Sequence, residues 1–365
     1  MVFIIIISPL ENIIGIESIV YPIVTVLLFF ALVVKRRVRR NESIFLLLYL
    51  VYAFITCLWS KADSPIYGMR ITTLMFLILI ITSEFDFSQH DYDIIENAMI
   101  IHGIVLLILC FTFGQYQDNR FWIISSTTGA DPNYLSQWFI LPICICIRKI
   151  FKANIKWIIK PIFIIEIVLA FYFIMQSGSR SGLVCSFAAL VLSALFENKD
   201  IIKRRPLIGL IILGGFIILF ILILNMMPSY TLYRFESDNG ALGGRAEVWK
   251  ELIGILNNNI GGTFFGMGEG STTYYTSHHI VAHNTYLDIL FENGIVGLAL
   301  YLAYCISILK KAIHKDGTVT IGLLLNYVLI FTLSSISMRP TIFAYFMAEF
   351  NVLDCSNDEV EYLNE

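Results

Sequence analysis

Two arginines and a histidine are the residues of this largely apolar chain whose types and settings could do chemistry. Arg180 lies in the turn SGSRSG between two apolar runs. Its neighbours Gly178 and Gly182 let a ligand or another backbone approach closely. The alternative is an arginine that extends to lipid headgroups. Flanking serines and glycines, in place of aromatic anchors, favour capture of an anion.

Arg245 opens the stretch RAEVWKELIGIL, whose apolar residues Val248, Leu252 and Ile255 fall on one helical face. The sequence therefore predicts an amphipathic helix at the outer membrane surface or capping a helix bundle. The helix dipole disfavours a cation in the first turn, but free N–H groups and an arginine together suit a phosphate. The alternatives are a plain surface charge, or a cation packed on Trp249.

His283 precedes Asn284 at the start of the next apolar run. An imidazole can accept a proton near neutral pH, which makes His283 a candidate general base. On one helical face, His279 and His283 would have the i, i+4 spacing of metal ligands. No carboxylate stands at a matching spacing, so we expect neither a metal nor a cofactor. The stretch FFGMGEGS lacks the spacing of a dinucleotide loop and is predicted to be a flexible turn.

Glu166 lies inside an apolar run, Trp157 to Gln176. An ionisable group at membrane depth costs several kcal/mol unless it is paired, so a role is the default expectation. The sequence names no partner for it.

Composition makes the chain an integral membrane protein. Hydrophobic residues make up 57% and charged residues 15%, with a mean hydropathy of +0.76, whereas soluble domains carry about 25% charged residues. The apolar runs are long and do not alternate, so helices are expected and a barrel is not. A net charge of -3 gives no basic patch for nucleic acid. Six of the seven cysteines fall inside or at the edge of apolar runs, where we expect small buried side chains. The N-terminal stretch lacks the features of a cleaved signal.

The basic clusters fix a predicted topology. KRRVRR, RKIFKANIK, NKDIIKRR and KKAIHKD all fall on the same side when the spans alternate, and the positive-inside rule makes that side cytoplasmic. We expect one integral membrane domain over 1–365, all-α, with about eleven spans, or about twelve if residues 2–16 also cross. Residues 228–283 are predicted to form one long periplasmic segment. SGSRSG, that segment and STTGADPN would then share the outer side. The expected spans are 18–34, 43–60, 70–83, 94–113, 134–147, 157–176, 183–196, 207–226, 284–309, 319–335 and 341–353.

From about Thr128 onward the chain resembles the O-antigen ligase and polymerase superfamily of bacterial envelope glycan assembly. The motifs that carry the resemblance are, in order, TGADPNYLSQWFILPI, QSGSRSGLV, GRAEVWKELIGIL, FFGMGEGS and HNTYLDILFENGIVGLALYL. Each is degenerate alone, and their order, spacing and topology make the match. The N-terminal third contributes only its hydropathy.

The resemblance implies a multi-span, metal-independent glycosyltransferase of the lipid-linked-donor (GT-C) type in the bacterial inner membrane, with its site facing the periplasm. The donor would be a glycan on undecaprenyl pyrophosphate. By position in the motifs, Arg180 and Arg245 match arginines that hold the pyrophosphate, and His283 matches the histidine that activates the acceptor hydroxyl. Glu292, in the FENGIVG turn, would orient the loop or the sugar, or have a structural role.

The first hypothesis is a polymerase that joins lipid-linked repeat units into O-antigen, capsule or exopolysaccharide. The alternative is a ligase that moves finished glycan onto lipid A-core or protein. A transporter or flippase of the lipid-linked glycan is the rival from a different class, but transporters place charges near the bilayer midplane, and here only Glu166 is deep. A chain-length regulator and a flippase are possible partners beside membrane lipid. The sequence does not separate polymerase from ligase.

Overall fold

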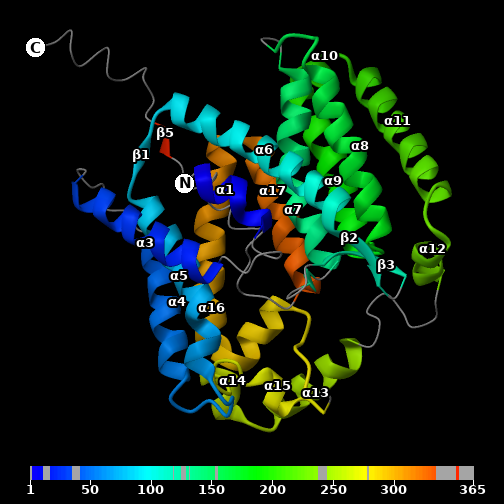
Figure 1. Cartoon of the computed structure of the whole chain (residues 1–365). Helices are drawn as coiled ribbons and strands as arrows, with labels where there is room; N and C mark the ends of the chain where they lie inside the picture. Colours follow the sequence, from blue (N-terminus) through cyan, green and yellow to red (C-terminus); the bar gives the residue numbers. More distant parts are fainter. Residues whose placement is uncertain are drawn as a thin grey trace, which may run out of the picture.

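The computed structural model describes residues 2–10, 17–34, 42–117, 119–124, 129–130, 132–152, 155–236, 245–277, 279–333 and 351–352. Helices dominate this part of the chain (Figure 1). They are α1 (Val2–Ile7), α3 (Glu17–Val34), α4 (Glu42–Thr56), α5 (Pro65–Ser83), α6 (Gln89–Phe113), α7 (Pro132–Phe151), α8 (Lys160–Gln176), α9 (Arg180–Glu197), α10 (Lys199–Arg204), α11 (Pro206–Asn225), α12 (Ser229–Glu236), α13 (Arg245–Asn257), α14 (Ile260–Phe265), α15 (Thr272–Tyr275), α16 (Thr285–Lys315) and α17 (Gly317–Leu329), with the 3-10 turns η1 (Ser8–Leu10) and η2 (Ile330–Thr332).

Short strands form two small sheets. In one, β1 (Asp86–Phe87) pairs in parallel with β5 (Asn351–Val352). In the other, β2 (Gly114–Gln117) and β3 (Arg120–Ile124) form an antiparallel hairpin to which β4 (Gly129–Ala130) adds. The hairpin lies between the expected spans 94–113 and 134–147, where the sequence predicts only an external loop.

Within the described residues, six helices are long and apolar enough to cross a membrane, which confirms an all-α polytopic membrane protein. They are Pro65–Ser83, Gln89–Phe113, Pro132–Phe151, Arg180–Glu197, Pro206–Asn225 and Thr285–His314, and the shorter apolar helices are Ile19–Ala31, Ile44–Thr56 and Gly317–Thr332. The count of eleven or twelve spans stays a prediction, because the last expected span, 341–353, lies almost wholly outside the described residues. The six residues of α1 are far fewer than the roughly 20 that a span needs.

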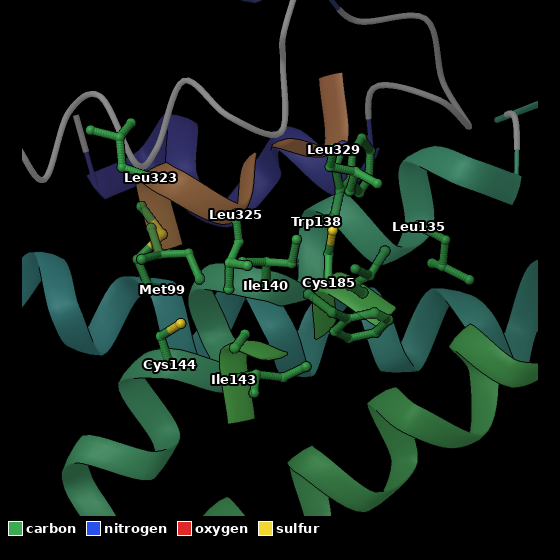
Figure 2. Packing of buried hydrophobic residues seen from close by; sticks show 14 of the residues in the cluster. Met99, Leu135, Trp138, Ile140, Ile143, Cys144, Cys185, Leu323, Leu325 and Leu329 are labelled. Atoms are coloured by element: carbon green, nitrogen blue, oxygen red, sulfur yellow. The ribbon is translucent and has the colours of Figure 1, made fainter. Parts of the chain in front are cut away.

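The core is centred on α7, which packs against α6, α8, α9 and α17. Ile140, Ile143 and Cys144 from α7 lie close to Met99 from α6 and Leu323 from α17 (Figure 2). Cys144 and Cys146 are wholly buried and unbridged, as expected for cysteines that behave as small hydrophobes. Because α7 contacts helices on several sides, it fixes where the ends of its neighbours lie.

A cluster of ion pairs joins the loops at one end of the bundle. Arg148 on α7 contacts both Glu96 on α6 (Nη1 to Oε1, 2.6 Å) and Asp316 at the α16–α17 turn. Lys149 Nζ lies 2.8 Å from Glu96 Oε2, and the Tyr92 hydroxyl donates to Asp316 Oδ2 at 2.9 Å. These contacts bring together loops that the sequence assigns to one side of the membrane. The alternation of spans therefore agrees with the fold.

The helices α13, α14 and α15 lie together at one end of the molecule, under the start of α16 (Figure 1). Val248, Leu252 and Leu256 of α13 are buried in a small separate core with Leu287 and Phe291 of α16. This confirms the amphipathic helix and shows that it caps the bundle. Ile255, expected on the same face, is only partly buried.

The helix α16 is broken at Gly294, whose φ of 66° and ψ of -171° are not helical. The carbonyls of Phe291 and Glu292 instead accept from the N–H groups of Met267 (2.8 Å) and Gly268 (2.9 Å). A side chain at Gly294 would collide with the Phe264 carbonyl, so only glycine fits. The glycine-rich stretch is therefore a docked loop and not merely the flexible turn that the sequence predicts.

The same loop is tied to the end of α4. Tyr52 donates to the Phe265 carbonyl (3.0 Å), Trp59 Nε1 to the Gly266 carbonyl (3.1 Å) and Ser60 Oγ to the Glu269 carbonyl (2.7 Å). The N-terminal part of the chain thus supports the loop through hydrogen bonds, although its sequence carries no motif.

We expect Glu96→Ala to lower the free energy of unfolding by roughly 3–5 kcal/mol, because it leaves two cations in the cluster without this carboxylate. Glu96 is 1% exposed and pairs with both Arg148 and Lys149. Thermal unfolding of the detergent-solubilised protein measures the loss. The matched control is Asp93→Asn, one turn earlier, where Asp93 Oδ1 accepts from Gln89 Nε2 at 3.3 Å in an exposed setting. Equal stability of the two variants would contradict a buried charge cluster.

Candidate functional site

Arg180 is the first residue of α9. Ser179 caps the helix by accepting from the Gly182 N–H at 3.3 Å, and Gly178 takes a φ of 65° in the turn before it. A side chain at Gly182 would collide with Ser136 of α7, so α9 begins directly against the start of α7. The half-buried Arg180 therefore stands at a helix start, and not in the middle of an open turn.

Arg120 on β3 holds this turn, and the sequence reasoning missed it. Its Nε donates to the Ser177 carbonyl at 2.9 Å and its Nη2 to Asn133 Oδ1 at 3.2 Å. Phe121 packs on Phe173 of α8 with ring centroids 4.9 Å apart, which seats the hairpin. The signal that could have found it is an Asp-Asn pair between short runs rich in aromatic and β-branched residues, which indicates a hairpin.

Arg245 is the first residue of α13 and is half-buried. The residues before it, including Gly243 and Gly244, lie outside the described part of the chain. One turn later, Trp249 Nε1 donates to the Ala282 carbonyl at 2.7 Å, and the Trp249 ring meets Phe331 edge-on with centroids 5.3 Å apart. These contacts tie the start of α13 to the loop that carries His283 and to η2.

His283 comes two residues before α16 and has a φ of 51°. A left-handed conformation costs a residue with a side chain roughly 1–2 kcal/mol, so its surroundings must enforce it. Asn284 caps α16 by accepting from the N–H groups of Tyr286 (3.1 Å) and Leu287 (3.2 Å). His283 is half-buried beside this cap.

His279 and His283 do not lie on one helical face, which was the alternative weighed for a metal site. The described residues between α15 and α16 are not helical, and His279 also has a left-handed φ, 53°. His279 Nδ1 lies 3.0 Å from the Thr273 carbonyl oxygen. The two imidazoles therefore do not share a helical face. Among the described residues, no group of three His, Cys, Asp or Glu side chains could hold a metal ion.

The segment 331–333 joins the three helix starts. Thr332 Oγ1 donates to Ser181 Oγ, beside Arg180, at 3.0 Å. Thr285 Oγ1, at the start of α16, donates to the Leu333 carbonyl at 2.7 Å. Phe331 contacts Trp249 on α13. The structure thus brings together the helix starts that carry Arg180 and Arg245 and the loop that carries His283.

Such an arrangement is chemically suited to an anion. Each helix start presents N–H groups without intrahelical acceptors and the positive end of the helix dipole. Two arginines, on helices that both contact the segment 331–333, add permanent positive charge with forked donors that match phosphate oxygens. An imidazole beside them could take a proton from a neighbouring hydroxyl.

Glu292 lies on α16 just before the break and holds α15. Its Oε1 accepts from the Thr272 N–H (3.3 Å) and Oγ1 (2.8 Å). Nearby, Glu269 Oε2 accepts from Asn293 Nδ2 at 2.9 Å. Burial, and then the neighbouring Glu292, raise the pKa of Glu269, while the Asn293 hydrogen bond lowers it. These contacts attach Glu292 to the start of α15, and its role, to orient the loop or the sugar or a structural one, stays a prediction.

Glu166 is 3% exposed in the interior of α8. A side chain at Gly103 of α6 would collide with its Oε1, so the carboxyl packs directly on α6. Ten residues separate it from Gln176 at the end of α8, roughly 15 Å along the helix. The contacts of Glu166 therefore do not connect it with the three helix starts.

Part of the chain is similar to a known family. Residues 165–302 match the O-antigen ligase family. The match spans α9, α13, the glycine-rich loop and the first part of α16, and so includes Arg180, Arg245, His283 and Glu292. The chain is also similar to the teichuronic acid biosynthesis protein TuaE of Bacillus subtilis (strain 168), with 24% identity over 340 residues. That alignment covers 80% of this chain and 66% of the relative, so the chain spans about two thirds of the relative's length.

These findings confirm the family resemblance. The structure has the helices of a multi-pass membrane protein, and residues 165–302 are similar to the O-antigen ligase family. The roles of the arginines, the histidine and the glutamates stay predictions.

We expect Arg120→Met to destabilise the protein by about 1–3 kcal/mol, because it leaves the Ser177 carbonyl and the Asn133 amide without this donor. Thermal unfolding in detergent provides the measurement. Arg70→Met is the matched control, since the Arg70 guanidinium stacks at 3.9 Å on the exposed ring of Tyr67 and such contacts are worth about 0.5–1 kcal/mol. A larger loss for Arg70→Met would refute the anchoring role of Arg120.

Proposed function

We propose that the protein is a glycosyltransferase that polymerises oligosaccharide repeat units carried on undecaprenyl pyrophosphate into a surface polysaccharide. The observation that carries the proposal is the attachment of three helix starts, those of α9, α13 and α16, to the segment 331–333. Arg180, Arg245 and His283 stand at these starts. The name of the relative, a protein of teichuronic acid biosynthesis, supports an envelope polymer as the product.

In the proposed reaction the acceptor hydroxyl oxygen forms a bond to the anomeric carbon of the donor. The bond from that carbon to the phosphate oxygen breaks, and the lipid pyrophosphate leaves with the electron pair. Arg180 and Arg245 stabilise the negative charge that grows on the leaving group. His283 takes the hydroxyl proton, which accounts for a factor of roughly 10²–10⁴ in rate. Attack opposite the leaving group inverts the anomeric centre, and the two guanidiniums act where a metal ion would otherwise be needed.

The proposed site faces the outer side of the bacterial inner membrane, the periplasm. The positive-inside rule assigns the loops that carry Arg148 and Lys149 to the cytoplasm. Arg180 opens α9 after one crossing from that side by α8. The connection between α6 and α7, from which Arg120 contacts the turn before Arg180, is likewise one crossing, by α7, from that side. The lipid-linked donor would therefore reach the site after a flippase has carried it across.

A ligase that transfers glycan to lipid A-core or to protein is the second candidate, favoured by the description of the matched family. Purified protein in vesicles with a lipid-linked repeat unit separates the two reactions. A lipid-linked product of increasing length supports the polymerase. Transfer of glycan off the carrier only when a separate acceptor is added supports the ligase. Movement of the donor across the vesicle membrane without any new glycosidic bond would instead indicate a transporter.

We expect Arg245→Lys to lose most of the transfer activity although it keeps the charge, because an ammonium group cannot reproduce the guanidinium's paired hydrogen bonds to phosphate. The kcat/KM for the pyrophosphate donor should account for most of the decrease. Arg204→Lys on α10, exposed and remote in sequence from these helix starts, is the control and should transfer at the wild-type rate. Wild-type turnover of Arg245→Lys would remove the pyrophosphate role.

We expect His283→Ala to bind the lipid-linked donor with unchanged affinity and to lose transfer by roughly 10²–10⁴-fold, because only the proton acceptor is removed. Donor binding to the purified protein and product formation are measured on the same preparation. Transfer at the wild-type rate would eliminate His283 as the general base.

A further inference from the structure

The peptide groups of Ala282 are held from two directions by side chains. Its carbonyl accepts from Trp249 Nε1 of α13 at 2.7 Å, and its N–H donates to Asp288 Oδ1 of α16 at 3.1 Å. Ala282 is 0% exposed, so water does not replace either partner. Asp288 is itself 5% exposed. A single residue is thus clamped between two helices.

The clamped residue immediately precedes His283. On its other side, His283 is followed by Asn284, whose side chain is engaged in capping α16. The backbone is therefore fixed on both sides of a residue with a left-handed φ of 51°. Since φ and ψ set the direction of the Cα–Cβ bond, the clamp sets the direction in which the His283 side chain leaves the backbone.

We propose that Trp249 and Asp288 are positioning residues that aim the His283 imidazole at the acceptor hydroxyl. The inference rests on the proposed role of His283 and deepens it. Neither residue belongs to the set singled out for chemistry, and neither needs to touch substrate to act. A proton acceptor displaced by about 1 Å can lose a factor of up to about 10² in rate, so small movements of Ala282 matter.

The position of Trp249 gives the clamp a second property. Trp249 follows Arg245 by four residues, about one helical turn. One rigid side chain therefore links the start of α13, where the donor pyrophosphate would bind, to the loop that carries the base. The placement of the base relative to the donor depends on this link, and not on the loop alone.

Trp249→Phe tests the carbonyl side of the clamp, because it removes the N–H donor and keeps a ring against Phe331. We expect kcat for transfer to fall by about 10–100-fold with a donor KM within about twofold of wild type. In a His283→Ala background the same change should cause no further loss, since the base it positions is gone.

The matched control is Glu251→Ala on the same helix. Glu251 accepts from Ser277 N–H (3.0 Å) and Oγ (3.2 Å), and so ties the far end of the same loop, in an exposed setting. We expect it to keep kcat near the wild-type value. A fall in kcat equal to that of Trp249→Phe would mean that general loosening of the loop, and not aim of the base, limits the rate.

Asp288 tests the N–H side without changing α13. Asp288→Asn keeps an acceptor for the Ala282 N–H and should retain most of kcat, whereas Asp288→Ala should lose about as much as Trp249→Phe. Thermal unfolding of each variant shows whether it is folded. Two results overturn the clamp: equal kcat for Asp288→Ala and wild type, or a Trp249→Phe defect confined to donor KM, which would place Trp249 with Arg245 alone.

The transfer rates of these variants distinguish an error in the positioning role of Trp249 and Asp288 from an error in the proposed function. If His283→Ala still transfers, the general base is wrong and the clamp has nothing to position. If His283→Ala is inactive while Trp249→Phe and Asp288→Ala keep the wild-type kcat, the base stands and the clamp is wrong.

Discussion

The break in α16 at Gly294 is the constraint on which much of this end of the protein depends. A helix that stops and restarts leaves carbonyls without intrahelical donors, and in apolar surroundings each of them is costly. The carbonyls of Phe291 and Glu292 obtain donors from Met267 and Gly268. The broken helix and the glycine-rich loop therefore stabilise one another. Trp59 and Ser60 donate hydrogen bonds to carbonyls of the same loop. The loop therefore also depends on the N-terminal part of the chain, which lies outside the matched region.

Charged residues occur at two places in this fold. At the end marked by Arg148, each cation is neutralised by a buried carboxylate, so these charges hold helices together. At the helix starts of α9 and α13, the arginines stand where dipoles already favour anions. Placing cations there opposes the local preference of the helix. The role proposed for these arginines, holding a phosphate group, matches the anion preference of the two helix starts.

Sequence reasoning found the helical membrane fold, for identifiable reasons. Continuous apolar runs predict helices, and the breakers around Arg180 and Arg245 mark helix starts. The contacts of Thr332 and Leu333 were out of reach, because a hydroxyl and a carbonyl at a helix end form no pattern. The alternative that His279 and His283 share a helical face does not hold, because i, i+4 spacing has meaning only in a helix and both residues have left-handed backbones. Arg120 was missed because its hairpin was taken for a plain loop.

The bond between Thr332 and Ser181 has a consequence for synthesis of the chain. Its partners are 151 residues apart, so the start of α9 emerges from the ribosome long before the segment that holds it. The hydrogen bond from Thr285, next to the loop that carries His283, also cannot form until Leu333 has been synthesised. Contacts of such sequence separation form late, after the intervening spans have entered the membrane. In the nascent protein, Arg180, Arg245 and His283 are therefore not held together until nearly all of the spans are in place. A truncated translation product that ends before Thr332 contains these residues but cannot assemble the proposed site.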